Sequence, residues 1–464
     1  MSLPQFLSRR TNWISTERID RAIAVGTPGN ECAKFLDSFQ AEAFEHLAER
    51  YKDETFAKLL ALKLTNLAAG RYHLVNRHSV LFSHPVLLMV DPANDCQLGC
   101  PSCVHTTNTS FGAVFDWPRT TLPVHTYEAF LERFGPFAFG AALYNYGEPL
   151  LNKHFDKIVR ASKEYLLNAI TSTNLSMPLA NAEAIVDSGL DYMVLSIDGA
   201  TQAVYERYRR KGDLALVLEN VRKLVAAKKA LGSSTPYLVW QFLTFEHNHH
   251  ELPEAMRLAK ALGVNEISVA TPFAVDSDDP TIRPVKSPKE GFYRLHAPGG
   301  QSLSRARNQG MANRSEAIER AFGKSWESRF LETGPNSTAT RDGTCSWLYF
   351  NMTMDGAARI MPCYMAPDKV ERKLVFSNFG PDETTDALAI VNSPMATLAR
   401  ESFASPESYE KNACLLSREQ LPYCAKCEEK TSPPYSFRNV RHDIHSLDFK
   451  RVISEELASK LTAW

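Results

Sequence analysis

The pattern that most constrains the fold is an alternation of short apolar segments with amphipathic stretches between residues 84 and 272. Six apolar segments of strand length occur there, at residues 85–90, 141–146, 168–173, 192–197, 237–243 and 266–270. Helical periodicity fills the intervals, near residues 126–134, 154–166, 180–188, 201–230 and 250–262. Successive strand–helix units predict parallel strands joined by right-handed crossovers. We therefore expect an α/β fold, a partial (β/α)6 TIM-like barrel whose functional groups gather at the C-terminal strand ends.

The segments that flank this barrel region differ from it in pattern. Residues 1–83 mix polar and apolar positions at helical spacing and predict a helical N-terminal extension. Residues 273–340 are rich in Pro, Asp, Ser and Gly, which predicts a loop-rich linker with one helix near 313–326. Residues 341–440 predict a small cysteine-rich domain, and residues 441–464 a terminal amphipathic helix.

Composition excludes several classes of protein. The 464 residues include 52 Lys and Arg against 53 Asp and Glu, and this balance argues against a nucleic-acid partner. No run of about 18 apolar residues occurs, so no membrane-spanning helix is expected. The first residues, MSLPQFLSRRTNW, lack the apolar core of a secretory signal. We expect a cytoplasmic protein that binds neither nucleic acid nor membrane.

The nine cysteines are too few for a disulfide scaffold and are odd in number. Seven of them fall into two sets, Cys96, Cys100 and Cys103, and then Cys345, Cys363, Cys424 and Cys427. Clustered cysteines in a reducing compartment indicate metal ligands or catalytic groups. Cys32 and Cys414 stand apart, and the sequence assigns no role to either.

The first cysteine set, Cys96, Cys100 and Cys103, follows the first expected strand in the segment DPANDCQLGCPSC. Three thiolates on one loop can hold three corners of a 4Fe-4S cluster and leave the fourth iron open. Structural zinc would need a fourth ligand, for which His105 is a candidate. The position at a C-terminal strand end favours the cluster over zinc.

Polar residues also follow the next three strands, in the segments YNYGEP, TSTN and SIDG. The candidate binding residues in and after them are Tyr146, Gly147, Glu148, Pro149, Ser172, Asn174, Ser196, Asp198 and Arg209. Each segment alone could be an ordinary turn. Because parallel strand ends meet at one rim of a barrel, together they indicate a single site.

Residues 84–272 resemble the radical S-adenosylmethionine (SAM) superfamily. CQLGCPSC resembles its three-cysteine cluster loop, GEP its motif for the methionine amino group, and SIDG with Arg209 its ribose and carboxylate contacts. Tyr146 stands where that family often has glycine. The resemblance implies that SAM chelates the open iron and that the reduced cluster breaks the C5′–S bond. The resulting 5′-deoxyadenosyl radical would abstract a substrate hydrogen, with a flavodoxin- or ferredoxin-type reductant as partner.

The second cysteine set is divided between a hairpin and a knuckle. Cys345 and Cys363 bracket a predicted hairpin with its turn at 354–357, and Cys424 and Cys427 form the knuckle CAKC. Four such thiolates suit zinc and a closed iron–sulfur cluster equally well. The C-terminal half resembles the SPASM/Twitch extension of radical SAM enzymes, in its single-cluster form. That resemblance implies one auxiliary 4Fe-4S cluster that accepts an electron.

A histidine-rich segment, FEHNHHEL, follows the fifth strand at 245–252. It offers His247, His249, His250 and Glu251 as possible metal ligands. We expect these histidines to be solvated loop side chains, with Asn248 capping the next helix.

The sequence and the resemblance together predict a radical SAM oxidoreductase acting on a small polar metabolite, by a two-electron oxidation. A peptide-modifying maturase and a radical epimerase are alternatives within the enzyme class. The small-metabolite hypothesis is preferred to the maturase because the pattern of residues 1–80 is helical. A small leader-peptide-binding domain would be rich in strands. A zinc-ribbon binding protein is the alternative from another class. No general base, hydrogen donor or substrate is identified.

Overall fold

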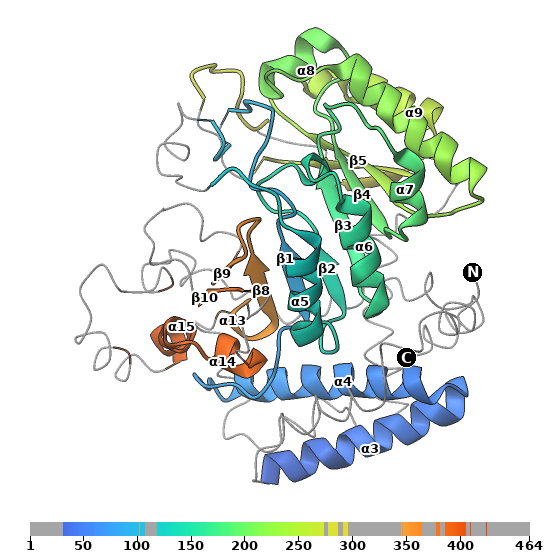
Figure 1. Cartoon of the computed structure of the whole chain (residues 1–464). Helices are drawn as coiled ribbons and strands as arrows, with labels where there is room; N and C mark the ends of the chain where they lie inside the picture. Colours follow the sequence, from blue (N-terminus) through green and yellow to red (C-terminus); the bar gives the residue numbers. More distant parts are fainter. Residues whose placement is uncertain are drawn as a thin grey trace.

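The computed structural model describes residues 31–101, 103–106, 118–272, 277–285, 291–295, 345, 347–363, 377–380, 386–404, 409 and 424. The centre of the fold is a parallel array of six strands, as the alternation predicts (Figure 1). They are β1 (Leu87–Val90), β2 (Gly140–Ala142), β3 (Asn168–Thr173), β4 (Tyr192–Ser196), β5 (Tyr237–Leu243) and β6 (Glu266–Ala270). Each pairs in parallel with the next, so the α/β class is confirmed and the array is compatible with a partial barrel.

Helices connect these strands. They are α5 (Val124–Phe134), α6 (Phe155–Glu164), α7 (Ala182–Asp187), α8 (Gln202–Tyr208), α9 (Leu214–Ala230) and α10 (Leu252–Leu262), with 3-10 turns η2 (Pro149–Leu151) and η3 (His249–Glu251). The helix expected over 201–230 is split into α8 and α9. Arg209 leaves the helical conformation, and the Asp213 side chain starts α9 by accepting from the Leu216 amide. The break matters because Arg209 belongs to the candidate site.

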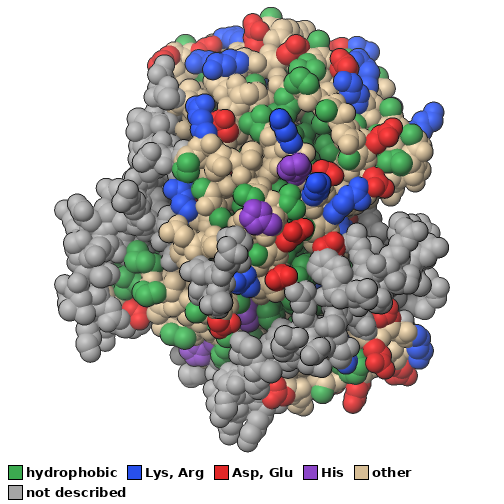
Figure 2. Space-filling model, viewed as in Figure 1, with side chains coloured by type: hydrophobic (Ala, Val, Ile, Leu, Met, Phe, Trp, Pro, Cys, Tyr) green, Lys and Arg blue, Asp and Glu red, His purple; other side chains and the backbone are tan. Residues whose placement is uncertain are grey.

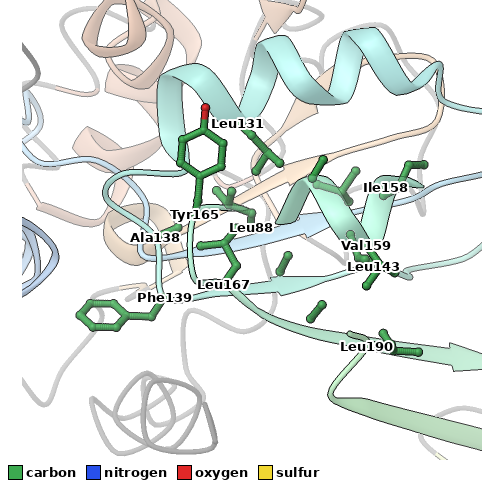
Figure 3. Close-up of a cluster of buried hydrophobic side chains, with 14 of the residues drawn as sticks. Leu88, Leu131, Ala138, Phe139, Leu143, Ile158, Val159, Tyr165, Leu167 and Leu190 are labelled. Carbon is green, nitrogen blue, oxygen red and sulfur yellow. The ribbon is translucent and has the colours of Figure 1, made fainter. Parts of the chain in front are cut away.

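The core lies between the strands and the helices that cover their outer face (Figure 3). Leu88, Leu143 and Leu167 come from the strands or their ends and are fully buried. Leu131 of α5 and Ile158 of α6 are fully buried against them. Burial of these apolar side chains stabilises the packing of the helices on the strands. The strand ends, which carry the polar residues, are thereby held in place.

The described part of the N-terminal extension, from residue 31, contains two long helices, α3 (Glu31–Tyr51) and α4 (Glu54–Val75), which lie beneath the sheet (Figure 1). Lys63 of α4 is 1% exposed and donates to the carbonyls of Gly135 and Ala138. Asn66 donates to the His84 carbonyl at 3.0 Å. These bonds tie α4 to the loops that enter β1 and β2. The extension therefore covers the N-terminal strand ends, opposite the candidate site.

The C-terminal region joins the same sheet. The strands β8 (Asn351–Met354) and β9 (Arg359–Met361) form the predicted hairpin, and β8 pairs in parallel with β1. β10 (Ser377–Asn378) follows β9, so the strand order is β10-β9-β8-β1-β2-β3-β4-β5-β6-β7. The sequence assigned this hairpin to a small separate domain, whereas its backbone extends the barrel sheet. Short helices α13 (Trp347–Phe350), α14 (Ala387–Val391) and α15 (Pro394–Ala404) flank it.

The linker expected over 273–340 also contributes a strand. β7 (Gly291–Arg294) pairs antiparallel with β6. An antiparallel strand at the end of a parallel array is common in mixed sheets. The helices expected near 313–326 and over 441–464 lie outside the described residues.

The described surface carries charges of both signs. Figure 2 shows Lys and Arg intermingled with Asp and Glu over the upper part of one face. Exposed large hydrophobic side chains in the described part of the chain are isolated: Val80, Leu231 and Tyr293. Among the helices described, none has the length and apolar character to span a membrane.

Candidate functional site

The loop after β1 holds the first cysteine set. Cys100 is buried, and Cys96 and Cys103 are half-buried. Burial raises the pKa of the Cys100 thiol to about 11, while the nearby Arg209 guanidinium opposes that rise. Burial also raises the pKa values of the Cys96 and Cys103 thiols. Backbone N–H groups that hydrogen-bond both sulfurs act in the opposite direction and lower these pKa values. The loop thus offers three sulfur donors with N–H groups directed at them.

The loop after β2, residues 144–149, packs directly on the cysteine loop. The Glu148 amide donates to the Asp95 carbonyl at 2.8 Å. A Cβ atom on Gly147 would lie 1.6 Å from the Ala93 carbonyl oxygen, so no side chain fits there. The Tyr146 carbonyl lies 3.1 Å from His105 Nε2. This contact engages the one histidine that the sequence offered as a fourth zinc ligand. β2 is shorter than expected because the chain turns into this loop.

Residues at the end of β3 link the two loops. Asn174 Nδ2 lies 3.6 Å from the Cys96 sulfur, and Asn174 Oδ1 accepts from Gln97 at 2.8 Å. The buried Glu148 carboxylate accepts from the Thr173 hydroxyl at 2.6 Å and from the Asn174 amide at 2.8 Å. Glu148 therefore holds the strand end in place, with both carboxylate oxygens engaged by protein donors.

The end of β4 supplies the charged part of the site. Asp198 is fully buried and accepts from Arg209 Nε at 2.6 Å and from the Leu243 amide at 2.7 Å. The Arg209 guanidinium also hydrogen-bonds the Cys100 thiol. Ser172 and Ser196, on adjacent strands, have their hydroxyls 3.3 Å apart. The sequence-predicted residues of β2, β3 and β4 therefore do meet at one rim.

Substituting Asp198 by asparagine is expected to destabilise the fold by about 3–5 kcal/mol, because the buried guanidinium of Arg209 loses its charge partner. The measurement is the free energy of unfolding in urea. The matched control is Asp187→Asn, which breaks the exposed pair with Arg160 and should cost at most about 1 kcal/mol. Equal losses in both variants would contradict the expectation.

The residues at this rim fit a three-thiolate cluster with an amino acid ligand. Two buried amide donors next to the cysteine loop, Asn94 Nδ2 and Asn145 Nδ2, have no partner in the described structure and could serve a carboxylate. The three thiols share one loop, although in the described residues no three acidic, histidine or cysteine side chains already stand at metal-binding distances. Sulfur is the donor that iron–sulfur clusters require.

The second cysteine set lies at the other end of the hairpin. Because β8 runs parallel to β1, its turn at Asp355 and Gly356 reaches the first cysteine loop. Cys345 precedes α13 and Cys363 follows β9, which places both towards the N-terminal end of β1. Cys424 is buried, and Cys427 lies outside the described residues. The four-ligand set therefore remains a prediction.

Sequence reasoning missed several residues that organise the rim. Asp91 and Asn94 precede the cysteines and bond the loop at 145–147 and the hairpin turn, respectively. Their signal was present, since both stand directly after a strand end. The expectation for the histidine-rich segment was wrong at His247, which is 5% exposed, and correct for the exposed His249 and His250.

Asn248 also differs from its expected role. Its side chain does not cap the following turn. Instead it is fully buried, accepts from the Phe245 amide at 2.7 Å and donates to the Asp198 carbonyl at 3.0 Å. Asn248 therefore holds the loop after β5 against the loop after β4.

Comparison with known proteins identifies this part of the chain. Residues 90–247 match the family model of the Radical SAM superfamily. These residues are a radical SAM domain. The match begins at the last residue of β1 and includes the first cysteine set and the candidate site residues from Tyr146 to Arg209. The chain therefore contains a domain of a superfamily of radical enzymes, and the match implies a 4Fe-4S cluster and SAM for that domain.

Two curated proteins and one solved structure are similar to the chain. The PqqA peptide cyclase of Gluconobacter oxydans is 25% identical over 290 residues, 61% of this chain and 71% of that protein. A probable GTP 3′,8-cyclase of Methanocaldococcus jannaschii is 30% identical over 118 residues, 25% of this chain and 38% of that protein. The crystal structure of Streptococcus suis SuiB has a TM-score of 0.46 and 14% identity, over 80% of each chain.

Proposed function

We propose that this radical SAM enzyme cleaves SAM reductively and uses the 5′-deoxyadenosyl radical to modify a peptide. The observation that carries the peptide assignment is the similarity to the PqqA peptide cyclase, whose 290 aligned residues exceed the radical SAM domain. A similarity confined to the radical SAM domain would concern SAM binding alone. An alignment that extends beyond this domain also covers regions that can recognise the substrate.

The roles of the rim residues follow from their contacts. Cys96, Cys100 and Cys103 hold a 4Fe-4S cluster. When bound there, the reduced cluster supplies the electron for SAM cleavage. The loop around Gly147 approaches the cysteine loop so closely that its backbone carbonyls can accept the methionine ammonium. Arg209, ion-paired with Asp198, provides a fixed positive charge beside Cys100.

Three further predicted positions complete the SAM site. Ser172, Ser196 and Asn174 are hydrogen-bonding groups at the ends of β3 and β4, beside the cysteine loop. They suit the hydroxyl groups of ribose and the methionine carboxylate. Pro149 starts the 3-10 turn η2, and the Tyr146 carbonyl lies 3.1 Å from His105 Nε2.

We also propose an auxiliary 4Fe-4S cluster on Cys345, Cys363, Cys424 and Cys427. The support is the hairpin β8–β9, which places Cys345 and Cys363 at the same end of one structural unit. A closed cluster would accept the electron that remains after hydrogen abstraction, so an oxidative modification of the peptide fits it best. A small polar metabolite, the first choice from the sequence, has less support from the relatives.

The test is an anaerobic assay of the full chain with dithionite and SAM. We expect about eight irons per chain after reconstitution and formation of 5′-deoxyadenosine. The assay is then supplied with synthetic peptides whose sequences come from short open reading frames next to the gene. Each peptide carries deuterium at one Cα or Cβ position in turn. Deuterium transfer into 5′-deoxyadenosine from a peptide supports the proposal. Transfer from deuterated small metabolites and from no peptide would overturn the peptide assignment, and absence of 5′-deoxyadenosine would overturn the activity.

A further inference from the structure

A buried carboxylate stands at the C-terminal end of β1 and belongs to no predicted motif. Asp91 is 1% exposed, and no lysine, arginine or histidine pairs with it in the described part of the chain. Its Oδ1 accepts from the Asn145 amide at 2.7 Å and its Oδ2 from the Tyr146 amide at 3.1 Å. The Gly147 amide also hydrogen-bonds it. One carboxylate thus collects three consecutive backbone N–H groups.

This contact fixes the direction of the loop carbonyls. In a trans peptide unit the C=O group is antiparallel to the N–H group of the next residue. Because the amides of 145–147 converge on Asp91, the carbonyls of 144–146 point away from it. Several carbonyls on one side of a short loop form an acceptor set for an ammonium group. The Tyr146 carbonyl is already within 3.1 Å of His105 Nε2, which marks that side as a hydrogen-bonding surface.

The C-terminal hairpin holds Asp91 from the other side. The Asp91 amide donates to the Met354 carbonyl at 2.9 Å. At the turn, the Gly356 amide donates to Asn94 Oδ1 at 2.6 Å. Asp355 is fully buried next to Asp91 but is neutralised by Arg359, whose Nε lies 2.7 Å from Asp355 Oδ2. The hairpin therefore fixes both ends of the segment 91–94 that leads into the cysteine loop.

We propose that Asp91 is a positioning residue for SAM, which orients the carbonyls of 144–146 towards the methionine ammonium, and that the hairpin turn at 355–356 completes this site. The inference rests on the proposed function, since it concerns the same SAM site. It assigns to the C-terminal hairpin a part in SAM binding that is separate from any auxiliary cluster at its far end.

The test compares variants of the reconstituted full chain. Asp91→Asn keeps the volume but loses an acceptor, so at least one amide of 145–147 loses its partner. We expect the KM for SAM and the dissociation constant measured by equilibrium dialysis to rise about tenfold. Iron per chain and kcat at saturating SAM should stay at wild-type values. A variant that lost iron or kcat with an unchanged KM would overturn the proposal.

A second variant approaches the site from the hairpin. Gly356→Ala would place a Cβ 2.9 Å from both the amide nitrogen and Oδ1 of Asn94, and we expect it to raise the KM for SAM as well. The control is Asp191→Asn, a buried carboxylate paired with Lys163 away from the rim, which should lower stability without changing KM. If Asp91→Asn does not fold, Gly356→Ala alone decides.

The outcomes separate the two proposals. A wild-type KM in every folded rim variant overturns the positioning role while leaving the activity intact. A wild-type protein that forms no 5′-deoxyadenosine overturns the proposed function itself.

Discussion

Replacing Cys100 with alanine is expected to abolish 5′-deoxyadenosine formation and to remove about four irons per chain. Cys100 is buried and lies beside the Arg209 guanidinium. A cluster held by two cysteines instead of three loses a ligand to iron. The measurement is iron per chain after anaerobic reconstitution, together with the yield of 5′-deoxyadenosine.

The matched control for this variant is Cys32→Ala, a cysteine outside both sets. We expect it to retain the wild-type iron content and activity. The corresponding change in the second set, Cys345→Ala, should also lose about four irons but keep SAM cleavage, because we propose that only the cluster of the first set binds SAM. Full iron and activity in Cys100→Ala would refute the assignment of the first set.

Substituting Gly147 by alanine should lower SAM cleavage at saturating peptide by about 100-fold, because the loop must move by an ångström or more. The added Cβ would lie 1.6 Å from the Ala93 carbonyl oxygen and 2.7 Å from its carbon, both backbone atoms that precede the cysteine loop. Displacing either loop would change the distance between the carbonyls that we propose bind SAM and the cysteines that we propose hold the cluster. The measurement is the rate of 5′-deoxyadenosine formation.

The same chemical change at a neighbouring position provides the control. Gly99 lies inside the cysteine loop, yet the nearest atom to its added Cβ is Lys211 Cε at 3.7 Å, an ordinary contact. Gly99→Ala should therefore retain most of the activity. If Gly147→Ala and Gly99→Ala behaved alike, close packing of the two loops would not be what the reaction requires.

The sequence predicted the parts of the site that follow from local chemistry. Three cysteines on a short loop and the segments around Gly147, Asp198 and Arg209 are typical enough to be found without coordinates. Strand ends could be located because apolar runs end at polar residues, and parallel pairing then brings those ends to one rim. β3, β5 and β6 were predicted to the residue for the same reason.

Asp91 could not be recognised in that way. An aspartate after a strand resembles any turn residue in a sequence, and its bonds reach the amides of 145–147 across the sheet. His247 likewise resembled a solvated loop residue, because burial depends on which other loop covers it. A backbone amide has no residue-specific signal, so a carboxylate that binds only amides leaves no pattern in the chain.

By itself the sequence determined the order of strands and helices in the parallel array and predicted the three cysteines of the first set as ligands. Only the tertiary structure decided that β8 pairs with β1 and brings the Asp355–Gly356 turn to the segment before the first cysteine loop. The physical reason is that periodicity reports how a segment is buried and not which segment buries it. Any strand with one apolar face could have paired at that edge, and the choice depends on contacts between residues far apart in the chain.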